Sequence, residues 1–92
     1  MPKALFPLGQ LVMTPAAETA LAAAQLHPVQ LLARHVTGDW GNLPEEDVAE
    51  NLFSLEEGFR LFSAYDLDTG ERIYAITEWD RSATTLLTPQ DY

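Results

Sequence analysis

The sequence predicts an α+β fold, with an antiparallel sheet of three to four strands and two to three helices packed mainly on one face. Residues 14–36 are rich in alanine and leucine and show helical spacing of apolar positions. Residues 59–88 instead contain three runs of β-branched, aliphatic and aromatic residues, separated by turn residues. The length of 92 residues suits one domain, which we place over residues 1–92.

The N-terminal half is expected to hold one edge strand followed by two helices. Residues 8–13 are short and apolar, which favours an edge strand, with irregular chain packed on the core as the alternative. Thr14 and Pro15 are a typical helix start, and the alanine-rich residues 16–25 continue the first predicted helix. A second helix is predicted over residues 28–36, where apolar residues recur at the spacing of one buried face.

The C-terminal half is expected to hold a third helix and two consecutive β-hairpins. The third helix should begin within residues 43–47, where three acids lie at the positive end of its dipole, and end at Gly58. The hairpin strands are predicted over residues 59–67, 71–79 and 82–88. Asp and Gly residues in the first connection are typical of a tight turn.

The predicted core combines apolar positions of the helices and the strands. Its members are Val12, Leu21, Val29, Leu32, Val36, Leu52, Phe59, Leu61, Ile73, Ile76 and Leu87. A chain of this length buries only roughly 60–65% of its unfolded surface. A homo-oligomer is therefore one way in which the chain could gain stability.

The chain is strongly acidic, with 14 acidic and 5 basic side chains and a formal net charge of −9. This balance argues against direct binding to nucleic acid, because phosphate contacts need clustered Lys and Arg. The chain has no Cys, which excludes disulfides and thiolate metal sites. It shows neither a signal peptide nor a membrane-spanning segment, so we expect a cytoplasmic protein with no membrane association. No motif calls for a cofactor.

The first segment that could carry chemistry is residues 34–41. His35 could be a general base, with Asp39 as its orienting partner or as a metal ligand. In the structural alternative, His35 stabilises a helix C-terminus and Trp40 anchors the following turn in the core. The sequence favours the structural alternative.

The second such segment contains Glu78, Asp80 and Arg81. Together with Asp39, the two carboxylates could hold Mg²⁺, and with His35 as base they would form a small metal-dependent hydrolase or nuclease. An exposed hairpin turn is the simpler interpretation, with Arg81 in a salt bridge to one of the acids. These five residues are therefore candidates only, and no catalytic residue or metal site is assigned.

The third segment is acidic: no Lys or Arg occurs between Arg34 and Arg60. A solvated helix face is the usual explanation of such a run. The functional hypothesis is a docking face for a basic protein partner, formed by Glu45, Glu46, Glu50 and Glu57. Because a nuclease with this net charge would repel its substrate, the sequence favours a non-enzymatic protein–protein interaction module, with the hydrolase as the alternative.

Four segments resemble a family of short bacterial proteins carried on plasmids and other mobile elements. They are residues 32–41, 59–65, 76–85 and 86–92. Some members of that family are labelled "plasmid-related protein", and some carry a loose restriction-subunit label. Trp79 is a departure, since the family has a small residue there. The resemblance implies a mobile-element setting and no catalytic residues.

Overall fold

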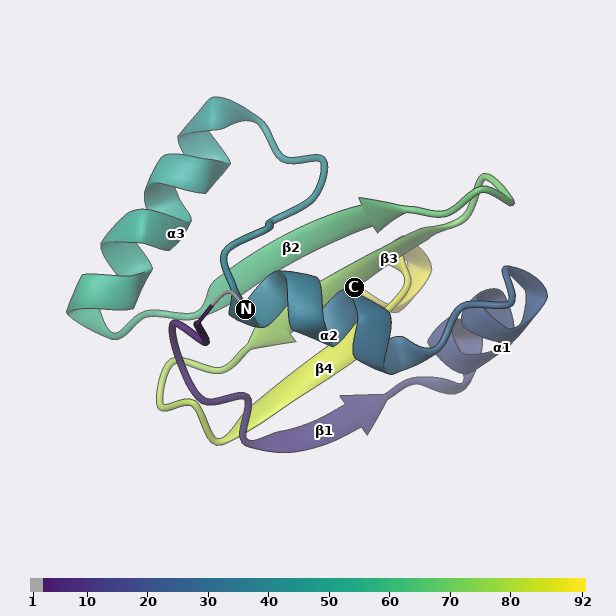
Figure 1. Cartoon of the computed structure of the whole chain (residues 1–92), viewed down its shortest axis with the longest axis horizontal. Helices are drawn as coiled ribbons and strands as arrows, with labels where there is room; N and C mark the ends of the chain where they lie inside the picture. Colours follow the sequence, from purple (N-terminus) through teal and green to yellow (C-terminus); the bar gives the residue numbers. More distant parts are fainter. Residues whose placement is uncertain (1–2) are drawn as a thin grey trace.

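The structure, a computed structural model, describes residues 3–92, so the first two residues of the predicted domain lie outside the described part. The elements are β1 (Gln10–Met13), α1 (Pro15–Ala23), α2 (Pro28–Val36), α3 (Glu45–Glu57), β2 (Leu61–Asp66), β3 (Arg72–Thr77), β4 (Ala83–Leu87) and the 3₁₀ helix η1 (Pro89–Asp91). The four strands form one sheet in the order β1-β4-β3-β2 (Figure 1). The predicted α+β class is confirmed.

The sheet is mixed rather than purely antiparallel. β2 pairs with β3 and β3 with β4 in antiparallel fashion, as two consecutive hairpins require. β1 instead runs parallel to β4, in the register Gln10↔Ala83 to Met13↔Leu86. A parallel neighbour needs a long connection, and here α1, α2, α3, β2 and β3 separate β1 from β4 along the chain.

Local capping accounts for the helix boundaries. The hydroxyl of Thr14 accepts a hydrogen bond from Ala17 N at 3.1 Å, which begins α1 as predicted. His27 caps α2 through Nδ1, which accepts from Val29 N at 3.1 Å. α2 has the predicted bounds. α3 ends at Gly58, whose φ of +79° is a left-handed conformation that glycine adopts without strain.

One face of the sheet carries the main core. Ile73, Ala75 and Thr77 alternate along β3 toward this face, and all are buried. α2 lies across the face in Figure 1, and α1 contributes Leu21 and small alanines to the same core. The opposite face carries an aromatic cluster in which the Phe62 and Tyr74 rings lie 4.8 Å apart, with the C-terminal Tyr92 against both.

The predicted core was only partly right. The buried members are Leu21, Leu32, Leu61, Ile73, Ile76 and Leu87, and Val36 is half-buried. The four residues that the structure leaves exposed are Val12, Val29, Leu52 and Phe59. α2 buries Leu31, Leu32 and His35, so its inward face is rotated away from Val29. α3 buries Asn51 and Ser54 toward the sheet rather than an apolar stripe through Leu52.

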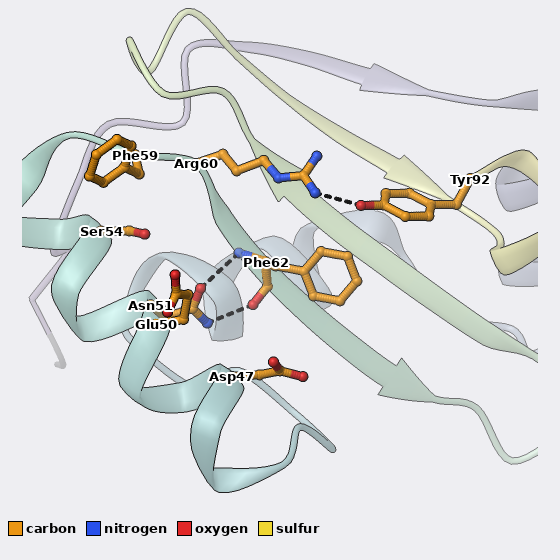
Figure 2. A pocket seen from close by; sticks show the side chains of 8 residues that line it. All are labelled: Asp47, Glu50, Asn51, Ser54, Phe59, Arg60, Phe62 and Tyr92. Atoms are coloured by element: carbon orange, nitrogen blue, oxygen red, sulfur yellow. Dashed lines mark hydrogen bonds between the residues drawn. The ribbon is translucent and has the colours of Figure 1, made fainter.

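Asn51 explains why a polar residue faces inward on α3. Its side-chain amide donates to the carbonyl of Phe62 at 2.7 Å, and its oxygen accepts from Phe62 N at 3.0 Å (Figure 2). The side chain thus pairs with the outer edge of β2 as a neighbouring strand would. Farther along that edge, Gly41 forms a bridge with Ala64, and a Cβ on Gly41 would lie 2.1 Å from the Ala64 carbonyl oxygen. These contacts close the β2 edge and position α3.

Among residues 3–92, no helix combines the length and the apolar character needed to cross a membrane.

Candidate functional site

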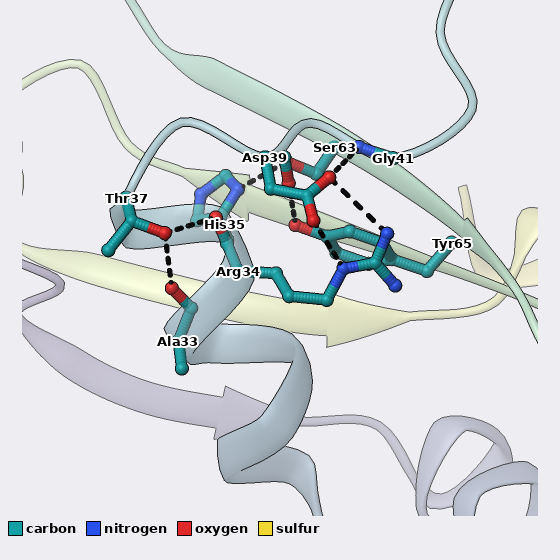
Figure 3. Close-up of polar contacts among 8 residues, drawn as sticks. All are labelled: Ala33, Arg34, His35, Thr37, Asp39, Gly41, Ser63 and Tyr65. Atoms are coloured by element: carbon teal, nitrogen blue, oxygen red, sulfur yellow. Dashed lines mark hydrogen bonds and ion pairs between the residues drawn. The ribbon is translucent and has the colours of Figure 1, made fainter. Parts of the chain in front are cut away.

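His35 is fully buried at the C-terminal end of α2, and both its ring nitrogens form hydrogen bonds, of which Figure 3 shows the one with Ser63. Nδ1 lies 2.6 Å from the Ser63 hydroxyl oxygen, and Nε2 lies 2.9 Å from the Thr77 hydroxyl oxygen. Neither nitrogen is left to take a proton from a substrate or to bind a metal in this arrangement. The candidate base is therefore part of the core.

The hydroxyl network fixes the tautomer of His35. The Thr84 hydroxyl donates to the Leu8 carbonyl at 2.8 Å, so it must accept from Thr77, whose hydroxyl lies 2.7 Å away. Thr77 has then used its only proton, so it accepts from Nε2–H of His35. Nδ1 is consequently the acceptor and takes the Ser63 proton. Each polar atom in this chain of bonds is satisfied by a neutral imidazole.

Burial lowers the pKa of His35 from 6.5 to about 4. Two aromatic rings pack nearly perpendicular to the imidazole, with the Phe6 centroid at 5.2 Å and the Trp40 centroid at 5.8 Å. His35 is therefore structural, as the favoured alternative held, but it acts as a buried neutral ring and not as a cation at the helix C-terminus. The accompanying prediction for Trp40 is confirmed, because its side chain is buried in a cluster with Phe6 and Leu61.

Asp39 is held by Arg34 on the surface beside this core (Figure 3). Arg34 Nε and Nη2 donate to the two carboxylate oxygens at 2.7 and 3.3 Å, and this hydrogen bonding lowers the pKa of Asp39. The Arg34 guanidinium also lies 4.5 Å from the centre of the Tyr65 ring. The Tyr65 hydroxyl donates to the Asp39 carbonyl at 2.6 Å, and burial raises the pKa of Tyr65 to about 12. Asp39 thus has structural partners that fix the turn after α2.

Asp80 belongs to the turn between β3 and β4. Its carboxylate accepts from Ser82 N at 3.0 Å, and hydrogen bonds from Ser82 lower the pKa of Asp80. Glu78 lies on the same turn with its side chain exposed, and its backbone N–H donates to the Ala83 carbonyl. The turn interpretation of this segment accounts for the contacts of Asp80.

Arg81 does not form the predicted salt bridge to Glu78 or Asp80. Its guanidinium donates to backbone carbonyls instead, reaching Phe59 O at 2.6 Å and Ser54 O at 3.0 Å. Ser54 lies in the last turn of α3, so Arg81 places a cation at the negative end of that helix dipole. Glu56 and Glu57 are unfavourable at this negative end of the dipole, and the Arg81 contact offsets them and connects the helix to the hairpin.

The two segments meet around a filled core rather than around a cleft. Phe6 is buried, its ring lies 6.3 Å from that of Trp40, and the Arg81 guanidinium lies 5.8 Å from the Phe6 centroid. Within the described residues 3–92, no three His, Asp or Glu side chains gather in a way that could hold a metal ion. The geometry therefore gives no support to a hydrolase centre made of the residues proposed above.

Three of the four predicted acidic-face residues share one side of α3. At about 100° of rotation per residue, Glu46, Glu50 and Glu57 lie within about 40° of one another. Glu45 lies about a quarter turn from Glu46. All four side chains are exposed. We call these four residues the acidic face.

Phe53 lies among these acids, although it was not one of the residues predicted for the site. It is 55% exposed and occupies the same side of α3, three residues after Glu50 and four before Glu57. Its ring stacks on that of Phe59, with centroids 5.7 Å apart and planes 13° from parallel. The sequence contains a signal for this position. Val48 and Leu55 share one side of the helix and form its apolar stripe, and Phe53 lies outside that stripe.

A groove of about 450 Å³ runs beside the acidic face, between α3 and β2 (Figure 2). Its lining residues are Asp47, Glu50, Asn51, Ser54, Phe59, Arg60, Phe62 and Tyr92. The acids come from α3, and the Phe62 and Tyr92 rings come from the opposite wall. Arg60 donates to the Tyr92 hydroxyl, and its guanidinium lies 5.7 Å from the Tyr92 ring centre. The groove therefore combines carboxylates with aromatic surfaces.

Comparison of the chain with protein-family models, with curated proteins and with solved structures found no match.

Proposed function

We propose that this protein is a non-enzymatic interaction module that docks a basic protein surface on its acidic face. The observation that carries the proposal is the grouping of Glu46, Glu50 and Glu57 around the exposed Phe53, next to the groove between α3 and β2. Exposed aromatic side chains supply much of the binding energy at protein interfaces. Acids around them select a cationic partner and speed its encounter.

The groove offers a place for one Lys or Arg side chain of the partner. Asp47 and Glu50 would pair with the cation, while Phe62 would contact its aliphatic stem and charged end. The chain's own Arg60 guanidinium already lies beside the Tyr92 ring, so Phe62 is the ring of the groove that we assign to the partner's cation. A cation over an aromatic ring contributes about 0.5–1 kcal/mol at an exposed site.

The resemblance to proteins of plasmids and other mobile elements supplies the proposed setting. A small acidic protein of a mobile element, acting in the cytoplasm, would meet many basic host proteins. Proteins that bind nucleic acid are among them, because they carry the cationic surfaces that an acidic face complements.

The proposal is tested by capturing partners from bacterial lysate with the wild-type chain and with two matched variants. In the first variant, Glu45, Glu46, Glu50 and Glu57 are all replaced with Gln. In the control, four exposed acids elsewhere are neutralised: Glu18→Gln, Asp68→Asn, Glu71→Gln and Glu78→Gln. Both variants lose four negative charges, so they differ in the position of the charge change and not in its size.

We expect the wild type and the control to capture a basic protein that elutes as salt rises, because exposed ion pairs are screened. The acidic-face variant should lose that protein while keeping its circular dichroism spectrum. Phe53→Ala should also weaken capture without changing the net charge. Equal capture by both Gln variants, or no captured protein from several hosts, would leave the acidic face as a solvated helix surface.

A further inference from the structure

The two edges of the sheet differ in whether other parts of the chain cover them. The outer edge of β2 is closed by the Asn51 amide and by the bridge between Gly41 and Ala64. β1 pairs with β4 on one side only, and Figure 1 shows no element beside its other edge. Within residues 3–92, no other strand is available to pair there.

The backbone of β1 presents unused hydrogen-bonding groups at this edge. Gln10 N donates to Ser82 O at 2.9 Å, and Thr14 N donates to Leu86 O at 3.0 Å. Backbone groups alternate in direction along a strand, so those of Leu11 and Met13 turn away from β4. An edge of this kind is a template for another strand unless it is blocked.

β1 is short, reading Gln-Leu-Val-Met, and it contains neither Pro nor a charged residue that would block its outer edge. Its Leu11 is 56% exposed and its Val12 is 42% exposed. Beside the strand lies an apolar groove of about 350 Å³ that includes Leu11, Val29 and Leu86. An exposed apolar patch with an open strand edge marks an association surface.

The charge distribution indicates that the molecule bound at the β1 edge and its groove is a second copy of the chain. Between Lys3 and Arg34, Glu18 is the only Asp, Glu, Lys or Arg, in a chain that has 19 such residues. The groove beside β1 likewise has no Asp, Glu, Lys or Arg among its lining residues, so a basic partner gains no ion pair there. Two acidic copies, however, can meet here without placing like charges opposite each other, and they would be repelled at most other surfaces.

We propose that two copies pair through the outer edges of β1, antiparallel and related by a twofold axis. Antiparallel pairing is the arrangement in which both copies use the same residues, so the contact closes at a dimer. Leu11 and Met13 of each copy then exchange backbone hydrogen bonds with the other, and the sheet continues across the interface. A stable dimer buries about 1,200–2,000 Å² in total, more than four paired residues supply, so the groove beside Val29 forms part of the interface.

Sedimentation equilibrium over a range of protein concentrations tests the dimer with the full chain. The wild type should have the mass of two chains. Leu11→Asp places a carboxylate from each copy at the interface and should shift the protein to monomer. Leu52→Asp is the matched control, because Leu52 on α3 is also 56% exposed and lies away from β1. This control should remain dimeric. Val29→Asp is the second interface variant and should also dissociate the dimer if Leu11→Asp fails to fold.

Backbone hydrogen exchange separates edge pairing from any other mode of association. In the wild-type dimer the amides of Leu11 and Met13 should be protected, and in the Val29→Asp monomer they should exchange rapidly. A monomeric wild type at every concentration would overturn the proposal, as would a dimer with rapidly exchanging Leu11 and Met13 amides. The acidic-face variants should have the same dimer mass as the wild type. The dimer proposal and the proposed docking function can therefore fail independently of each other.

Discussion

Acidification should destabilise the fold through His35 at pH values above those at which the carboxylates of lowered pKa contribute. Burial lowers the pKa of His35 from 6.5 to about 4, while the unfolded chain keeps the ordinary value. The unfolded state therefore binds a proton in a pH range in which the folded state does not. The stability contributed by neutral His35 is fully present above pH 6.5 and is lost as the pH falls from 6.5 through about 4.

The pKa difference sets the size of this effect. The folded and unfolded values of about 4 and 6.5 correspond to about 3 kcal/mol of unfolding free energy in total, of which about 2 kcal/mol is lost between pH 7 and pH 5. Carboxylates with lowered pKa values add their losses only below their ordinary value of 3.8, so they lie outside this window. They are Asp39, Asp66, Asp80 and Asp91.

Urea denaturation at pH 7 and pH 5, at one protein concentration, measures the change. The wild type should lose about 2 kcal/mol, whereas His35→Asn should be less stable at pH 7 by about 1–3 kcal/mol and should lack the same pH-dependent loss. The wild type and His35→Asn are also compared in a His27→Asn background, because Asn caps a helix as well and His35 is then the only histidine of the chain. An NMR titration of the His35 ring gives the folded pKa directly. A His35→Asn variant with the wild-type loss between pH 7 and pH 5 would refute the reasoning.

The remaining predictions concern the core, the β2 edge and metal binding. Trp40→Ala should lower the unfolding free energy by about 3–5 kcal/mol, because the side chain is only 6% exposed; an unchanged thermal melt would contradict this. Asn51→Ala should cost about 1–3 kcal/mol, since it leaves the backbone groups of Phe62 without their partner. Hydrogen exchange should then accelerate at Phe62 N–H, and protection equal to the wild type would argue against the edge-closing role. Calorimetric titration with Mn²⁺ should show no stoichiometric site of micromolar affinity; such a site, abolished by Asp80→Ala, would revive the hydrolase hypothesis.

The candidate site could be predicted only in outline from the sequence. The run without Lys or Arg located the acids of α3, and helical spacing placed Glu46, Glu50 and Glu57 on one side. The aromatic wall of the groove could not be found in this way. Phe62 and Tyr92 come from a strand and from the end of the chain, and only the pairing of α3 with β2 brings them opposite Glu50.

The elements themselves follow from interactions between residues close in the chain. Thr14 caps the helix that begins at the next residue, and Gly58 ends α3 by adopting a positive φ. Turn residues separate the three hairpin strands at nearly the predicted positions. The acidic net charge is likewise a property of the sequence alone, because it depends on composition and not on arrangement.

The tertiary structure decided which groups meet and therefore what each residue does. His35 is a buried neutral ring because Ser63 and Thr77 hydrogen-bond to its two nitrogens. These residues lie 28 and 42 positions farther along the chain, in the neighbouring strands β2 and β3. β1 became a parallel edge strand, with Leu8 reached by a hydroxyl 76 residues farther along the chain. Helical and strand periodicity describe a single element and contain no information on its partner. A polar group can be buried where a distant group satisfies its hydrogen bonds. Which groups meet in this way is determined only when the elements pack.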